Sequence, residues 1–334
     1  MKERNPGIEL LRIVSMLMIV ASHSITHGNF NDFPFSLNGV FAIALSQGAR
    51  IGVDCFVLIT GYFSKNTSIN RRKLTNQYIE ILTYSILISV AMFLSGLLSV
   101  SKESILHTFL PFSSSQYWFA TCYLLLMIVA PILRVFVENT SKKIFATILL
   151  ILTVLWSVFP TILINAPGYS NFVWFVYLYL LGAFFNTYSF SITGKLKWFH
   201  GAGCLFIIML LTVITYYFGK DIPFFKENSI YLFGEMNKTP ALICAVALFF
   251  GFLNSKVKIH RFTKIVATCV FGVYLFHDNP YIRDFIWNKI FCNSQNINQP
   301  YFIPMLLLSI LIVFSVGIVI EFLRQKIMSL FMKR

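Results

Sequence analysis

The feature that most constrains this chain is a succession of long apolar segments separated by short polar connections. A helix needs about 20 largely apolar residues to cross the hydrocarbon core of a bilayer, and the chain contains about ten such segments. Hydrophobic residues make up 57% of the 334 residues and charged residues only 12%, whereas soluble globular proteins carry about 25% charged residues. So little charge cannot cover a water-soluble fold of this size. The predicted spans are Ile8–His27, Asn38–Phe63, Tyr78–Val100, Tyr117–Val137, Ile144–Ile164, Asn171–Thr187, Ala202–Phe218, Thr239–Leu253, Ile265–Ile282 and Ile303–Phe322.

These segments predict an all-α polytopic membrane protein, a bundle of about ten transmembrane helices that forms a single unit over residues 1–334. Lys and Arg total 27 against 13 Asp and Glu, a formal net charge of +14. In a soluble protein this excess would raise the question of nucleic acid, but in a membrane protein it is typical of the positive-inside rule. With the N-terminus in the cytoplasm, 20 of the 27 basic residues fall on the cytoplasmic side. We therefore expect both termini in the cytoplasm, an even number of spans, a lipid bilayer as partner and no nucleic acid.

Several common chemistries have no signature in this sequence. None of the six cysteines forms a C-x-x-C pair, so neither a zinc site nor a redox pair is indicated. The Walker, G-x-S-x-G, H-E-x-x-H and dinucleotide-binding motifs are absent as well. We expect no metal and no bound cofactor. Three tryptophans suit the aromatic belts at the membrane interfaces, namely Trp118, Trp174 and Trp287.

The first predicted span carries a line of polar residues. An ionisable side chain at the centre of a membrane helix costs about 2.5–3.5 kcal/mol, which makes each one a functional candidate. Arg12 and His23 are 11 residues apart, close to three helical turns, so they share one face about 16 Å apart. Arg12 could instead reach lipid phosphates while His23 bonds a neighbouring helix. The polar residues of this span are Glu9, Arg12, Ser15, Ser22, His23 and His27.

The second span and the connection after it carry further charges. Arg50 and Asp54 are i,i+4 neighbours that could neutralise each other, a structural role, or could line a polar interior. Arg71, Arg72 and Lys73 follow at the start of the third predicted helix. They could be a topological anchor, or they could bind the phosphates of an anionic cytoplasmic ligand.

The ninth span ends in His277 and Asp278, followed by Pro280. Running outward, it places His277 and Asp278 at a depth comparable to that of His23. We therefore expect them to face the same outer cavity as His23, where they would bind an acceptor or orient the imidazole. The alternative is an ordinary interfacial helix end, which Pro280 would mark.

Four sequence motifs, in order along most of the chain, resemble the membrane acyltransferase-3 family. Ile8–Ile13 leading to His23 matches its Arg-x10-His signature, and Gly52–Phe63 is similar to its G-V-D-x-F-F-x-x-S-G-F/Y segment. The other two matches are Tyr117-Trp118-Phe119 running to Pro131, and Gly272–His277, which resembles a late Y-L-x-H helix. One motif departs from the pattern, because the family often has Arg-x-x-Arg at its third helix. Here the residues three places after Arg72 and Lys73 are Thr75 and Asn76.

The resemblance implies ten helices in a bacterial cytoplasmic membrane, acetyl-coenzyme A as a cytoplasmic co-substrate, and an acceptor hydroxyl on a lipid-linked or cell-surface glycan. His23 would be the catalytic imidazole, acting as general base or as an acyl relay. Arg12 with Arg71, Arg72 and Lys73 would bind the acyl donor, and Arg50, Asp54, His277 and Asp278 would bind the acceptor or support the site. The alternatives are a transporter or flippase for a polysaccharide intermediate, and a polysaccharide polymerase.

Overall fold

The computed structural model describes residues 5–64, 68–112, 116–163, 168–188, 193–258 and 260–331. Within these ranges every regular element is a helix, which confirms the predicted all-α class. Seven spans there are long and apolar enough to cross a membrane: Pro6–Thr26, Leu37–Phe63, Arg71–Leu94, Trp118–Asn139, Lys142–Leu163, Trp198–Phe218 and Phe302–Leu330. The other three predicted spans form shorter helices, α9 (Asn171–Thr187), α12 (Thr239–Leu253) and α13 (Arg261–His277). The chain is therefore a multi-pass membrane protein.

The centre of the bundle is the antiparallel pair α1 (Pro6–Thr26) and α3 (Gly48–Phe63). Helix α1 begins with Pro6 in its first turn, and the Asn5 side chain accepts a hydrogen bond from the backbone N–H of Ile8 at 3.1 Å. Close approach of the two backbones requires Gly52, since a Cβ there would lie 2.7 Å from the carbonyl oxygen of Ser15. Small residues at such crossings are typical of helix packing in membranes. This contact fixes the height of α3 against the polar face of α1.

Helix α9 packs on another side of α3 through a second crossing of glycines. A Cβ on Gly182 would lie 2.5 Å from the carbonyl oxygen of Leu58, and one on Gly61 would lie 2.1 Å from that of Tyr179. Trp174 on α9 is fully buried, and its indole nitrogen donates a hydrogen bond to Asp54 at 3.0 Å. Trp174 therefore faces the interior of the bundle rather than lipid, because its indole partners a buried carboxylate.

The predicted second span is two helices rather than one. Helix α2 (Leu37–Leu45) has Ser46 as its C-cap, and α3 begins at Gly48. The Ser22 hydroxyl of α1 donates to the carbonyl of Ser46 and so holds the break against α1. Gln47 is thereby placed at the junction, beside the C-terminal half of α1.

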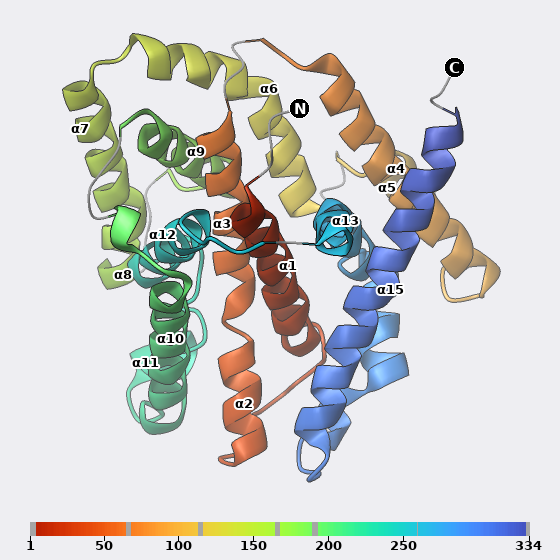
Figure 1. The fold of residues 1–334 in the computed structure, drawn as a ribbon. Coiled ribbons are helices and arrows are strands. Elements are labelled where there is room, and N and C mark those ends of the chain that lie inside the picture. Colours follow the sequence, from red (N-terminus) through yellow and green to blue (C-terminus); the bar gives the residue numbers. More distant parts are fainter. Residues whose placement is uncertain are drawn as a thin grey trace.

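The remaining helices surround this centre (Figure 1). Helix α13 contacts α1, and α15 (Phe302–Phe331) packs along α13. Helices α4 (Arg71–Leu94) and α6 (Trp118–Asn139) stand beside α13 and α9, and α10 (Trp198–Phe218) packs against α12 and α2. The other elements are α5 (Lys102–Phe109), α7 (Lys142–Thr153), η1 (Val154–Val158), α8 (Phe159–Leu163), η2 (Thr193–Lys195), α11 (Pro223–Asn228), α14 (Pro280–Asp284), η3 (Phe285–Phe291) and η4 (Asn293–Asn296).

The start of α1 and the end of α15 point toward the same end of the bundle (Figure 1). Near that end, α15 is joined to α4 by a charged cluster within the bundle. Glu321 is fully buried and accepts from Tyr84 at 3.0 Å and from Arg324 at 2.7 and 2.8 Å, while Arg324 also lies 3.4 Å from Glu80. These charges are tolerated in the bundle because they satisfy one another. Some basic residues counted for the topology lie outside the described residues: Lys2, Arg4, Lys65, Lys333 and Arg334.

Candidate active site

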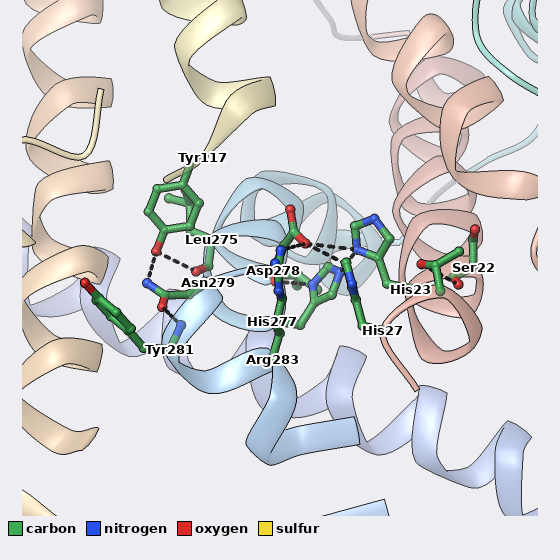
Figure 2. A network of polar contacts seen from close by, with 12 residues as sticks. Ser22, His23, His27, Tyr117, Leu275, His277, Asp278, Asn279, Tyr281 and Arg283 are labelled. Carbon is green, nitrogen blue, oxygen red and sulfur yellow. Dashed lines mark hydrogen bonds and ion pairs between the residues drawn. The ribbon is translucent and has the colours of Figure 1, made fainter. Parts of the chain in front are cut away.

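Three imidazoles and a carboxylate meet where the end of α1 reaches the end of α13 (Figure 2). His23 Nδ1 lies 3.0 Å from His277 Nε2 and 3.5 Å from Asp278 Oδ1. His27 Nε2 lies 3.1 Å from the same Asp278 oxygen, and the Arg283 guanidinium lies 3.8 Å from it. The structure therefore brings His277 and Asp278 to His23, as the sequence predicts.

The hydrogen bonds of His277 determine which nitrogen of His23 carries a proton. His277 Nδ1 lies 2.6 Å from the carbonyl oxygen of Val273, which can only accept, so Nδ1 carries the hydrogen. The other nitrogen of a neutral His277, Nε2, is then an acceptor, and His23 Nδ1 must be the donor to it. Neutral His23 consequently keeps its lone pair on Nε2. A base with its lone pair on a defined atom is what proton abstraction requires.

Asp278 is placed to stabilise the protonated form of His23. Its side chain is almost fully buried, and the carboxylate oxygen that His27 contacts is also the one nearest His23 Nδ1. The end of α1 is fixed in turn by Asn288, whose amide donates to the carbonyl of His27 at 2.8 Å. The ligand atoms of His23, His27 and Asp278 also lie within 4.8 Å of one another, close enough to share a divalent cation.

A second hydrogen-bonded group, formed with Tyr117 at the start of α6, holds the end of α13. Buried Asn279 donates to the Tyr117 hydroxyl at 2.6 Å, and Tyr117 donates to the carbonyl of Leu275 at 3.0 Å (Figure 2). Asn279 also caps α14 by accepting from the backbone N–H of Tyr281 at 2.9 Å. The turn that carries His277 and Asp278 is therefore tied to Tyr117 at the start of α6, where the third sequence motif begins.

A cavity of about 730 Å³ runs from this cluster along the polar face of α1. His23 and Asp278 line one end, which we call the His23 end, and Arg12 and Lys73 line the other, which we call the Arg12 end. His277 is fully buried and does not line the cavity. This differs from the expectation that it faces the cavity, because His277 lies behind His23 and turns Nδ1 to its own helix. Arg12 and His23 both line the cavity, so they share the polar face that helical periodicity predicts.

The Arg12 end carries two cations, Arg12 and Lys73, and one carboxylate, Glu80, which lies 3.4 Å from Arg324. Lys73 and Gln77, both on α4, line it together with Arg12. The Nε of Arg12 and the Oε1 of Gln77 are buried and have no hydrogen-bond partner within the described part of the chain. All three basic residues at the start of α4 are exposed, but Arg71 and Arg72 do not line the cavity, which separates them from Lys73 in the predicted donor cluster.

The predicted pair of Arg50 and Asp54 does not form. Arg50 Nε lies 3.5 Å from Glu235, and its guanidinium stacks 4.9 Å from the ring of Trp118. Asp54 is fully buried and bonds to Trp174 instead, and it does not line the cavity. Glu235 takes Arg50 because the connection after α11 folds over the His23 end, which brings a carboxylate 185 positions later in the chain to Arg50.

Sequence reasoning assigned no role to several residues around the cavity. His27 had a readable signal, since it lies one helical turn after His23 and so shares its face. Arg283 follows the predicted site by a few positions but carries no pattern of its own. Gln47 was readable only as a polar residue within a predicted span, and Glu235 had no signal, because a break between helices and a folded connection place them at the cavity.

Comparison of the chain with protein families identifies the acyltransferase domain family, which matches residues 5–320. No curated protein matches the chain, and no solved structure matches it. The family match covers nearly the whole chain and includes α1, α3, α6 and α13, which carry the four motifs. It favours acyl transfer over the transporter, flippase and polymerase alternatives. The chain therefore belongs to the membrane acyltransferase-3 family.

Proposed function

We propose that the protein is a membrane-bound O-acyltransferase of the bacterial cytoplasmic membrane, with ten spans and both termini in the cytoplasm. It transfers an acetyl group from acetyl-coenzyme A to a hydroxyl of a lipid-linked or cell-surface glycan. The observation that carries the proposal is that the cations of the Arg12 end and the base of the His23 end line one cavity.

The Arg12 end suits the donor because coenzyme A is strongly anionic and cytoplasmic. Arg12 and Lys73 offer charge-assisted hydrogen bonds to phosphate groups. The pantetheine arm would extend along the polar face of α1, and the unpartnered Oε1 of Gln77 could accept from one of its amide N–H groups. The rise of α1 between Arg12 and His23 is about 16 Å, so an extended arm is needed to present the thioester to the imidazole.

The transfer needs two proton transfers, one from the acceptor hydroxyl to His23 and one from His23 to the leaving sulfur. His23 Nε2 removes the proton of the acceptor hydroxyl while its oxygen attacks the thioester carbonyl carbon. The resulting imidazolium is stabilised by Asp278, 3.5 Å from Nδ1. When the carbon–sulfur bond breaks, the proton passes from Nε2 to the leaving sulfur, giving free coenzyme A thiol and an acetyl ester. The acyl group is conserved, and the base is regenerated.

The test is transfer of labelled acetyl from acetyl-coenzyme A to cell-envelope glycans by the purified protein in lipid nanodiscs. We expect label in an ester that mild base releases, with one equivalent of free thiol formed. His23→Ala should lower the transfer rate about 10²–10⁴-fold, the range that a general base contributes.

The matched control is His260→Ala, which removes an exposed imidazole before α13 and should leave the rate unchanged. Near-normal turnover by the His23 variant would overturn the role of His23. Base-stable label on an amine would overturn O-acylation.

A further inference from the structure

The His23 end of the cavity has a roof. Residues 230–235, in the connection between α11 and α12, line the cavity through Ile230, Tyr231, Gly234 and Glu235, and we call them the roof segment. Beyond it, the buried Lys238 donates to the carbonyl of Pro160. The Arg50–Glu235 ion pair attaches the roof segment to α3. The roof is thus held by a buried bond after its last residue and by a half-exposed ion pair at Glu235.

Gln47 lies beneath this roof with an unused acceptor. The residue is only 3% exposed, and its amide nitrogen donates to the Ser46 hydroxyl at 2.9 Å. Its Oε1 is buried and has no hydrogen-bond partner among the described residues. Gly234 covers it so closely that a Cβ there would lie 2.2 Å from Oε1. A buried amide oxygen without a donor is costly to the fold, and one beside a cavity points to a donor that a ligand supplies.

Each guanidinium at the His23 end lies beside a carboxylate. Arg50 is paired with Glu235, and Arg283 lies 3.8 Å from Asp278. A carboxylate beside a guanidinium offers both an acceptor and a donor, which complements neighbouring hydroxyls, since each hydroxyl both donates and accepts. The ring of Trp118 adds an apolar surface next to Arg50. This combination fits a neutral, polyhydroxylated ring better than an anionic group.

We propose that the roof segment and Gln47 form the acceptor subsite, and that it takes a neutral saccharide. The inference rests on the proposed function. One sugar hydroxyl donates to Gln47 Oε1, and its neighbours bond the Arg50–Glu235 pair. Because Oε1 has no exposed surface, the roof segment shifts when the sugar enters. The partly exposed Arg50–Glu235 pair then opens, and each partner bonds a sugar hydroxyl, while the bond from the buried Lys238 stays closed.

The experiment uses the purified full-length protein in nanodiscs with acetyl-coenzyme A and p-nitrophenyl glycosides as acceptors. The panel contains neutral hexosides, their monodeoxy derivatives and a hexuronide. Gln47→Leu keeps the size of the side chain and removes the acceptor. We expect the KM for the glycoside to rise about tenfold, as for loss of one hydrogen bond, with the KM for acetyl-coenzyme A unchanged. One monodeoxy glycoside should be a poor acceptor for the wild type, and Gln47→Leu should no longer distinguish it from its parent.

Gly234→Ala is the second variant, because its added Cβ displaces the Oε1 atom of Gln47 while position 47 remains glutamine. It should also raise the KM for the glycoside alone, so the inference stays testable if Gln47→Leu does not fold. An unchanged glycoside KM and deoxy profile in both variants, with normal wild-type transfer, would overturn the subsite and leave the proposed function intact. Preference for the hexuronide would overturn the neutral acceptor. Wild-type protein that acylates none of the glycosides would overturn the glycan acceptor itself.

Discussion

A single proton on His23 Nδ1 determines what the imidazole can do, and His277 holds that proton in place. His277→Leu removes the acceptor 3.0 Å from His23 and frees the imidazole to adopt the other tautomer. We expect kcat to fall about 10²-fold, within the range that general base catalysis contributes, while the KM for acetyl-coenzyme A stays unchanged. Steady-state kinetics of the purified variant measure both constants.

His277→Gln is the matched control for this prediction, because a glutamine amide can donate to Val273 and accept from His23 at once. It should recover part of the lost kcat. Equal losses in the Leu and Gln variants would mean that His277 acts only by filling space.

Substitutions at Lys73 and Arg71 distinguish which of these cations binds the acyl donor. Lys73 and Arg71 are both exposed, but only Lys73 lines the cavity. A charge-assisted bond to phosphate contributes about 1.5–3 kcal/mol, so Lys73→Ala should raise the KM for acetyl-coenzyme A about ten- to a hundredfold. Arg71→Ala should change it little. A larger effect at Arg71 than at Lys73 would show that the phosphates bind outside the cavity.

Single residues were predictable where a helix repeats them at a fixed spacing. The shared face of Arg12 and His23 follows from 3.6 residues per turn, and comparable depth was enough to bring Asp278 to them. The partner of Arg50 was not predictable, because Glu235 comes from a connection whose path depends on the whole fold. The proton position on His23 was equally hidden, since it depends on a carbonyl of another helix.

At the scale of helices, the crossing of α3 and α9 depends on glycine. Gly182 packs against the carbonyl of Leu58, and an added methyl would force the helices apart. Overpacking of this kind typically costs about 1–3 kcal/mol, so Gly182→Ala should lower the unfolding temperature in detergent. Gly203→Ala is the matched control on α10, where nothing lies within 4 Å. It should be neutral or slightly stabilising because alanine favours helix over glycine by about 1 kcal/mol.

Thermal unfolding followed by tryptophan fluorescence or by light scattering compares the two variants. Equal unfolding temperatures for Gly182→Ala and Gly203→Ala would contradict the close crossing.

Hydropathy was enough to find the helices but not their breaks. The run from Asn38 to Phe63 is apolar on average although Ser46, Gln47 and Gly48 lie in its middle, so hydropathy averaged over the run conceals the interruption at Gln47. The amphipathic ring of Trp174 predicts an interfacial position, but nothing in the sequence indicates that its indole N–H donates to the buried Asp54. In both cases a tertiary contact decides the outcome, and a single sequence does not record such contacts.

For the whole molecule, the charge distribution predicts an orientation that can be measured. Most basic residues fall on the side of the N-terminus, which the positive-inside rule places in the cytoplasm. Ser101→Cys, in the exposed connection before α5, should react with a membrane-impermeant maleimide added to intact cells. Lys142→Cys, exposed at the start of α7, should react only after the cells are permeabilised. Wild-type protein with its six cysteines gives the background, and the reverse pattern would invert the orientation.

The carbonyl oxygen that sets the tautomers of His277 and His23 belongs to the backbone of Val273 on α13. Every amino acid supplies the same oxygen, so replacing Val273 by another helix-compatible residue leaves that oxygen where His277 finds it. The acid–base asymmetry therefore depends on the side chain of His277 but not on the side chain at position 273. In evolutionary terms, the acceptor that sets the tautomer of His277 is a backbone carbonyl, and a substitution at its own position does not remove a backbone carbonyl.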